Sequence, residues 1–172
     1  QIDESNKAPR RTLEMISELL RYQLYGGNQK VSILQEIDYL KTYIALRKLR
    51  MSERLRLRVE FPPELNELNI YPLLFLPLVE NAFKYVGGDY QLDIIMKWEN
   101  NRISLFIRNS IPELSAEDEA LRKSVDERQR KGIGLVNLRR RLSLLYPSKH
   151  RLETRKEETE FVAELMIEIE EI

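Results

Sequence analysis

The stretch from residue 91 to residue 108 constrains the fold more than any other part of the chain, because it predicts an antiparallel hairpin. Two strand-like runs, 91–98 and 103–108, flank the pair Asn100-Asn101. Asparagine tolerates the left-handed backbone that tight turns require. A chain with this hairpin is not all-helical, and its sheet contains at least one antiparallel pair.

The remaining periodicities mix helices with strands. Apolar residues spaced three and four apart predict helices over residues 11–25, 33–50, 73–85 and 135–145. Alternation of apolar and polar residues predicts strands over residues 55–61, 151–157 and 160–169. Helices and antiparallel strands in mixed order indicate an α+β fold, a two-layer sandwich in which helices lie against one face of a sheet.

The composition argues against several kinds of site. The 172 residues include 28 basic and 28 acidic side chains, and this balance disfavours nucleic-acid binding. With no cysteine and a single histidine, His150, neither a disulfide framework nor a cysteine-built or histidine-built metal cluster is expected. No apolar run reaches the about 20 residues that a membrane-spanning helix needs. We therefore expect one soluble domain with a small extension.

One predicted helix carries polar side chains that suit a magnesium polyphosphate. Glu80, Asn81 and Lys84 are neighbours on this helix, within the string LVENAFKY at 78–85. Carboxylate or amide oxygens fit Mg2+, which takes its other ligands from phosphate and water, and an ammonium group meets phosphate as a point charge. Taken alone, the string has a plainer interpretation, in which Asn81 bonds the helix backbone and Lys84 is a solvated charge.

A second string, GIGL at 132–135, supplies the other half of a nucleotide site. Gly132 and Gly134 permit close approach to the backbone, and a helix that starts here leaves free N–H groups that favour an anion. Ordinary turn glycines are the alternative. Residues 112–130 are almost all polar or charged, so we expect a lid that folds over a nucleotide held between the Asn81 helix and this segment.

These strings resemble those of a known family. Residues 78–85 resemble the N box of sensor histidine kinases, and GIGLVNLRRRL at 132–142 resembles their second glycine box. The strings LRY at 20–22 and EIDYL at 36–40 are similar to the lead-in of the LytS-like branch. Several separate strings in the right order make the signal specific, and the resemblance extends over nearly the whole chain.

The resemblance implies a Bergerat-type ATP-binding fold of the GHKL superfamily, with a mixed, mostly antiparallel sheet and with ATP and Mg2+ as cofactors. Asn81 would be the metal ligand, and the lid hinge would include Gly132 and Gly134. The implied catalytic residues are Glu80, Asn81 and Lys84. The implied nucleotide-binding residues are Asn81, Lys84, Tyr85, Asn109, Gly132, Ile133, Gly134 and Leu135.

The sequence departs from the family at Asn109. The first glycine box of the family has an aspartate there, which receives the adenine amino group, whereas RNSIP at 108–112 lacks both the acid and its glycine. An asparagine oxygen still accepts a hydrogen bond, but without the charge we expect lower affinity. The departure keeps open a degenerate, non-catalytic interaction or scaffold module as an alternative function. A third hypothesis is a GHKL protein that phosphorylates serine on a regulatory partner, and the lead-in helix counts against it.

The family's phosphoacceptor histidine has no counterpart in this sequence. His150 follows the second glycine box and does not match the family motif, so we expect it in a surface loop. The chain begins on Gln1 without Met and looks excised from a longer protein. We expect it to bind ATP and to donate the γ-phosphate to a histidine upstream, without phosphorylating itself.

The resemblance also implies the setting of the longer protein. Residues 1–28 would be the end of the dimerisation and phosphoacceptor region, and residues 29–172 would be the ATP-binding domain. The full-length protein would be a homodimer that passes phosphate to a cognate response regulator. This part would be the cytoplasmic domain of an inner-membrane sensor, attached to the membrane only through upstream segments.

Overall fold

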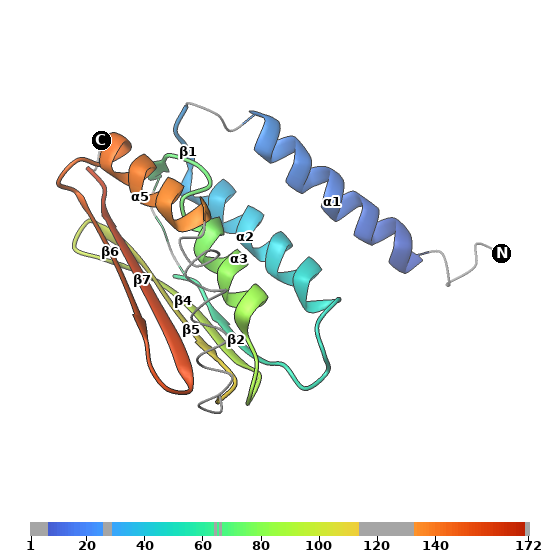
Figure 1. The fold of residues 1–172 in the computed structure, drawn as a ribbon. Helices are drawn as coiled ribbons and strands as arrows, with labels where there is room; N and C mark the ends of the chain where they lie inside the picture. Colours follow the sequence, from blue (N-terminus) through green and yellow to red (C-terminus); the bar gives the residue numbers. More distant parts are fainter. Residues whose placement is uncertain (1–6, 26–28, 64, 66, 114–132, 171–172) are drawn as a thin grey trace. The chain divides into compact units, whose positions relative to one another are not determined.

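The chain forms two compact units in the computed structural model, which describes residues 7–25, 29–63, 65, 67–113 and 133–170 (Figure 1). The first unit combines residues 1–53 with residues 65–73, and the second combines residues 54–64 with residues 74–172. All predicted site residues therefore belong to the second unit.

The first unit is built on two helices and a small sheet. Helix α1 spans Lys7–Tyr25 and contacts helix α2, which spans Ile33–Lys48. The short strands β1 (Val31–Ser32) and β3 (Asn69–Ile70) pair in antiparallel orientation. Periodicity predicted both helices. The two strands were missed, because two residues are too few to show an alternation.

A capping box fixes the start of α2. The Leu34 N–H donates to the Ser32 hydroxyl oxygen at 3.2 Å, and the Ser32 N–H donates to the Gln35 side-chain oxygen at 3.1 Å. These two bonds satisfy N–H groups that the helix itself leaves without acceptors. The helix therefore begins at Ile33, where the sequence predicts it.

Glu36 joins α1 and α2 to the turn before helix α3. Its side chain is fully buried, and its carboxylate accepts the Tyr22 hydroxyl at 2.6 Å and the Leu73 backbone N–H at 2.9 Å. The Tyr22 ring stacks on Tyr39 with 4.6 Å between centroids, and Gln23 donates to the Tyr39 hydroxyl at 2.9 Å. This cluster holds α1 on α2 within the first unit.

The second unit contains a five-stranded sheet with the order β2-β4-β5-β7-β6. The strands are β2 (Arg56–Glu60), β4 (Gln91–Glu99), β5 (Arg102–Ser110), β6 (His150–Lys156) and β7 (Glu160–Glu168). Strand β2 runs parallel to β4, and every other neighbouring pair is antiparallel. The expected mixed, mostly antiparallel sheet is confirmed.

The hairpin that joins β4 to β5 turns at Asn100-Asn101. These residues have φ angles of 51° and 59°, both in the left-handed region that two-residue hairpin turns of this kind require. Glu99 pairs with Arg102 directly beside the turn. The predicted hairpin is therefore confirmed, together with the reason for its sequence.

Two helices cover one face of this sheet (Figure 1). Helix α3 (Leu76–Tyr85) contacts β4 and β5, and helix α5 (Ile133–Leu145) contacts β6 and α3. Alternate residues of the strands form the buried apolar layer, which includes Leu92, Ile94, Met96, Ile103, Leu105, Ile107, Leu165 and Ile167. The two-layer α+β sandwich is the fold class that the sequence predicts.

Helix α3 begins three residues later than predicted. The sequence predicts a start near Leu73, but Leu73 has a φ angle of 62°, and this left-handed conformation does not occur inside a right-handed helix. The helix instead begins at Leu76, with Pro77 in its first turn. Proline is tolerated there because its missing N–H would have had no acceptor within the helix.

The prediction that His150 lies in a surface loop was wrong. His150 is the first residue of β6, it is half-buried, and its ring Nδ1 lies 2.8 Å from the Tyr146 carbonyl oxygen. The strand starts directly after the turn that contains Pro147. The histidine therefore contributes to the local structure of this turn.

Candidate functional site

Helix α3 presents polar side chains along one side and apolar side chains along the other. Glu80 and Lys84 are exposed, Asn81 is half-buried, and Tyr85 is 41% exposed. The Lys84 ammonium group lies 5.2 Å from the centroid of the Tyr85 ring, within the range of a cation–π interaction. The side chains buried between them are Leu78, Val79, Ala82 and Phe83. The Asn81 side chain is therefore not part of the apolar core.

Helix α5 begins inside the predicted glycine string, at Ile133. Gly134 is exposed, and in the described chain no atom lies within 4 Å of the position that a Cβ would occupy on it. Leu135 is half-buried. The residues that the structure describes thus leave open space beside Gly134. Gly132 and residues 114–132, most of the predicted lid, lie outside the described residues.

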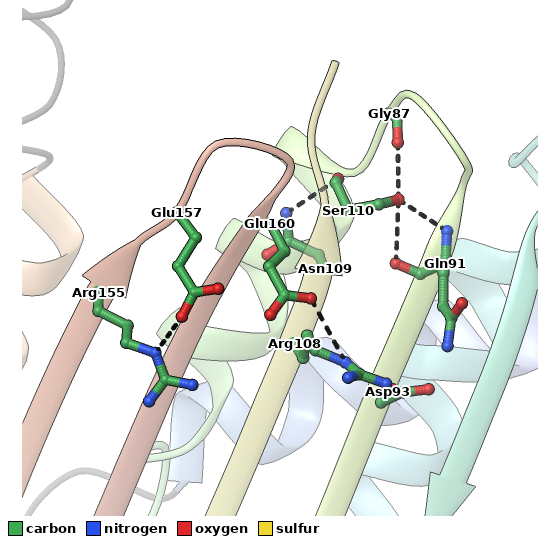
Figure 2. A network of polar contacts seen from close by, with 9 residues as sticks. All are labelled: Gly87, Gln91, Asp93, Arg108, Asn109, Ser110, Arg155, Glu157 and Glu160. Atoms are coloured by element: carbon green, nitrogen blue, oxygen red, sulfur yellow. Dashed lines mark hydrogen bonds and ion pairs between the residues drawn. The ribbon is translucent and has the colours of Figure 1, made fainter. Parts of the chain in front are cut away.

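Asn109 lies at the end of the buried row of β5. It is 1% exposed, and among the described residues only Glu36 and Asp93 are also buried polar or charged side chains. The Asn109 side-chain Nδ2 donates to the Ser110 carbonyl oxygen at 3.3 Å (Figure 2). With its amino end directed in this way, the carboxamide offers its Oδ1 atom as an acceptor.

Ser110 and Gly87 join the end of β5 to the turn that follows α3 (Figure 2). The Gly87 N–H donates to the Ser110 carbonyl oxygen at 2.9 Å, and the Ser110 hydroxyl donates to the Gly87 carbonyl oxygen at 2.7 Å. The same hydroxyl accepts the Gln91 N–H at 2.8 Å. Sequence reasoning missed Ser110, since its partners lie about twenty residues away and no local pattern marks them.

The opposite face of the sheet carries an ion-pair network. The Arg108 guanidinium lies 2.5 Å from the Asp93 carboxylate, whose side chain is 3% exposed, and 3.9 Å from Glu160. The hydrogen bond to Asp93 is the main cause that raises the pKa of Arg108. Successive residues of a strand point to opposite faces. Arg108 therefore does not share the face of its neighbour Asn109.

The second unit brings three of the predicted segments together. Helix α3, with Asn81 and Lys84, contacts β5, which ends with Asn109 and Ser110, and it also contacts α5, which includes Gly134. Among the described residues, no group of three or more His, Asp or Glu side chains is placed to hold a metal ion. A site with a single amide ligand suits Mg2+ that takes its other ligands from phosphate and water.

Comparison with known proteins points to one group. The family described as "Histidine kinase" matches residues 1–55. Sensor protein kinase HptS of Staphylococcus aureus is 28% identical over 153 residues, which are 86% of this chain and 30% of HptS. The resemblance to sensor histidine kinases is confirmed. The chain spans about 30% of the length of this curated relative.

Solved structures of histidine kinases share the fold. Acinetobacter baumannii histidine kinase AdeS matches with a TM-score of 0.52 and 15% identity, over 94% of this chain and 77% of AdeS. The mycobacterial sensor histidine kinase MprB matches with a TM-score of 0.53 and 14% identity, over 84% of this chain and 99% of MprB. Full-length ShkA, in complex with AMPPNP, matches with a TM-score of 0.54 and 14% identity, over 96% of this chain and 37% of ShkA.

These matches define the architecture and leave finer assignments as predictions. The chain has the α+β fold of histidine kinase catalytic domains, the Bergerat or GHKL fold. The LytS-like branch stays a prediction, and so does the functional boundary between residues 28 and 29. Among the helices that the structure describes, none has both the length and the apolar character to cross a bilayer.

Proposed function

We propose that this chain is the ATP-binding catalytic domain of a two-component sensor histidine kinase. The contact of α3 with both β5 and α5 carries the proposal, because it brings the helix of Asn81 against the strand of Asn109 and the helix of Gly134. The first turn of a helix has N–H groups without acceptors in the helix, and α5 would offer them to phosphate. Kinship with HptS and the AMPPNP bound to ShkA support this nucleotide class.

Each predicted residue has a distinct role in the proposed site. The Asn81 amide oxygen binds Mg2+, Lys84 and Tyr85 face the phosphates, and Asn109 accepts a hydrogen bond from the adenine amino group. At the start of α5, Ile133, Gly134 and Leu135 would lie along the phosphates, and the resemblance adds Gly132 to this set. The magnesium ion, when bound, offsets the negative charge of the phosphates.

The proposed reaction transfers the γ-phosphoryl group of ATP to a histidine outside this sequence. A neutral imidazole nitrogen attacks the γ-phosphorus in line, an N–P bond forms, the bond to the bridging oxygen breaks, and ADP leaves. The imidazole then releases its remaining N–H proton to solvent. Glu80 would orient Mg2+ through a water molecule rather than act as a base, because a neutral imidazole attacks without prior deprotonation. The chain contributes mostly by positioning and by charge neutralisation.

The proposal extends to the longer protein. Residues 1–28 end the dimerisation and phosphoacceptor region of a homodimer, and residues 29–172 form the ATP-binding domain. The phosphoryl group passes from the histidine to an aspartate of a cognate response regulator. This part of the protein lies in the cytoplasm, below an inner-membrane sensor region.

Calorimetric titration with Mg-ATP tests the proposal. We expect the parent chain to bind and Asn81→Ala to bind at least about tenfold more weakly, because the protein ligand to Mg2+ is lost. Asn69→Ala is the matched control, since Asn69 is exposed on β3 in the first unit. Equal affinities for Asn81→Ala and the parent would remove Asn81 from the site.

A non-catalytic scaffold is the second candidate function. The amide at Asn109, in place of the family's aspartate, favours it. A parent chain that shows no heat of binding with Mg-ATP, while its thermal unfolding remains cooperative, would support this candidate over the kinase.

A further inference from the structure

Ser110 connects two parts of the candidate nucleotide site, the turn after α3 and the side chain of Asn109. Its hydroxyl bonds the Gly87 carbonyl and the Gln91 N–H, and its carbonyl accepts both the Gly87 N–H and the Asn109 side-chain Nδ2 (Figure 2). We propose that Ser110 is a positioning residue, which holds the end of α3 and the Asn109 carboxamide in one fixed arrangement. This inference rests on the proposed function.

The bonds between Ser110 and Gly87 are reciprocal. Each residue gives one hydrogen to the carbonyl oxygen of the other, at 2.9 and 2.7 Å, so the two peptide segments are joined at two points. A pair of bonds fixes relative orientation as well as distance. Lys84 and Tyr85 precede Gly87 by only three and two residues, so this junction sets the last turn of α3.

The turn after α3 has no room to shift toward the strand. A Cβ on Gly87 would lie 2.9 Å from the Cδ atom of Pro112, and a Cβ on Gly88 would lie 2.8 Å from the Ile111 carbonyl oxygen. Gly88 also has a φ angle of +59°, which favours glycine. The backbone of the turn therefore packs directly against the residues that follow Ser110. The Ile111 N–H donates to the Thr159 carbonyl at 2.9 Å and anchors the other side.

The Ser110 carbonyl also orients Asn109. A carboxamide has one donating end and one accepting end, and a ligand meets whichever end is left over. With Nδ2 directed to the Ser110 carbonyl, Oδ1 is the end available to an adenine amino group. The same carbonyl thus sets the position of α3 and the hydrogen-bonding character of Asn109.

A fixed arrangement of this kind raises the affinity of ligands that contact both α3 and Asn109. Mg-ATP would contact Asn109 with its base and α3 with its phosphates. Adenosine has no phosphates and would contact Asn109 but not α3. Preorganisation raises affinity for a ligand that spans the fixed groups, because less freedom is lost on binding. Loss of the Ser110 hydroxyl should therefore weaken Mg-ATP more than adenosine.

The test compares affinities for Mg-ATP and adenosine in the parent and in variants of Ser110. For Ser110→Ala we expect Mg-ATP affinity to fall roughly threefold to tenfold, the effect of one or two net hydrogen bonds, and adenosine affinity to change less than about twofold. Ser110→Thr keeps a hydroxyl and should restore Mg-ATP binding. Ser104→Ala is the matched control, because Ser104 lies half-buried on the same strand and face, and the described structure gives it no side-chain hydrogen bond.

The outcomes separate a positioning role from a structural one. Equal weakening of both ligands, or no weakening of Mg-ATP, would overturn the inference while leaving the proposed function intact. A parent that binds neither ligand would overturn both. If Ser110→Ala does not fold, Ser110→Cys gives the same comparison, because a thiol is a weaker hydrogen-bond donor than a hydroxyl. We expect the Mg-ATP affinity of Ser110→Cys to be lower than that of the parent, but higher than that of a variant with no donor at this position.

Discussion

Glycines of the candidate site differ in what the chain demands of them. At Gly87 and Gly88 a side chain would collide with Pro112 or Ile111, so the protein itself requires glycine. At Gly134 the neighbouring space is open, and no atom of the described chain would collide with a Cβ atom. Among the described residues, therefore, none gives a reason for glycine at this position, and we expect a bound ligand to give one.

This contrast predicts opposite effects on folding and binding for Gly134→Ala. We expect the free energy of unfolding to rise by up to about 0.5 kcal/mol, because alanine loses less conformational freedom in a helix than glycine and Gly134 lies in the first turn of α5. We expect Mg-ATP affinity to fall, because the methyl group occupies the space offered to phosphate. Urea unfolding and calorimetric titration measure the two effects, and unchanged binding would show that no ligand approaches Gly134.

At the residue scale, local patterns predicted surface chemistry and missed contacts between distant segments. The exposure of Glu80 and Lys84 follows from helical spacing around a buried apolar side. The role of Ser110 does not, because its partners Gly87 and Gln91 are joined to it only by the fold. The close packing of Gly87 against Pro112 is likewise a tertiary effect that no local pattern marks.

At the element scale, a buried carboxylate is one of the groups that join α1 to α2. The Glu36 carboxylate accepts hydrogen bonds from the Tyr22 hydroxyl and from the Leu73 N–H. Loss of either donor would leave this fully buried charge with fewer hydrogen bonds. Leu73, just before α3, has a left-handed backbone, and its N–H donates to Glu36 from thirty-seven residues away. Apolar spacing reveals neither feature. The start of α2, set by its own capping box, was predictable.

Tyr22→Phe should destabilise the first unit. We expect a loss of about 1–2 kcal/mol in the free energy of unfolding, because Glu36 loses a donor without access to water. Tyr90→Phe is the matched control, since Tyr90 is also half-buried and the described structure gives its hydroxyl no hydrogen bond. Chemical unfolding followed by circular dichroism measures both, and equal losses in the two variants would contradict the role of the Tyr22 hydroxyl.

The same contact predicts a loss of stability in alkaline solution. Burial, followed by the charge of Glu36 and the hydrogen bond to it, raises the pKa of Tyr22 above its ordinary value of 10.0. The unfolded chain therefore loses this proton first, so the stabilisation is complete below about pH 10 and declines as the pH rises further. The difference in the free energy of unfolding between the parent and Tyr22→Phe should stay constant up to about pH 10 and narrow as the pH rises above that value. A constant difference would show that Tyr22 titrates normally in the folded chain.

At the scale of the whole molecule, the sequence predicted the architecture more fully than the strand order. Alternating and helical patterns identify the sheet and its covering helices, and the resemblance supplies the mixed sheet. Neither pattern identifies β4 as the parallel neighbour of β2, because alternation marks a strand without marking its partner. The lid prediction covers residues 112–130, of which residues 114–130 lie outside the described chain.

A chain that begins at residue 29 tests the proposed functional boundary. Removal of α1 exposes the side of α2 that carries Tyr39 and takes the Tyr22 hydroxyl from Glu36, so we expect a loss of about 2–4 kcal/mol in stability. All proposed nucleotide-binding residues are retained, so Mg-ATP affinity should stay within about twofold of the parent value. A folded but non-binding product would place α1 inside the functional domain.

The outer strands of the sheet determine how the molecule behaves beside copies of itself. Strand β2 exposes Arg56, Arg58 and Glu60, and β6 exposes Arg151, Glu153 and Arg155. A neighbouring chain that added a strand at either margin would strip water from several charges without replacing it. We therefore expect these charged edges to disfavour strand addition between copies of the protein in concentrated solution.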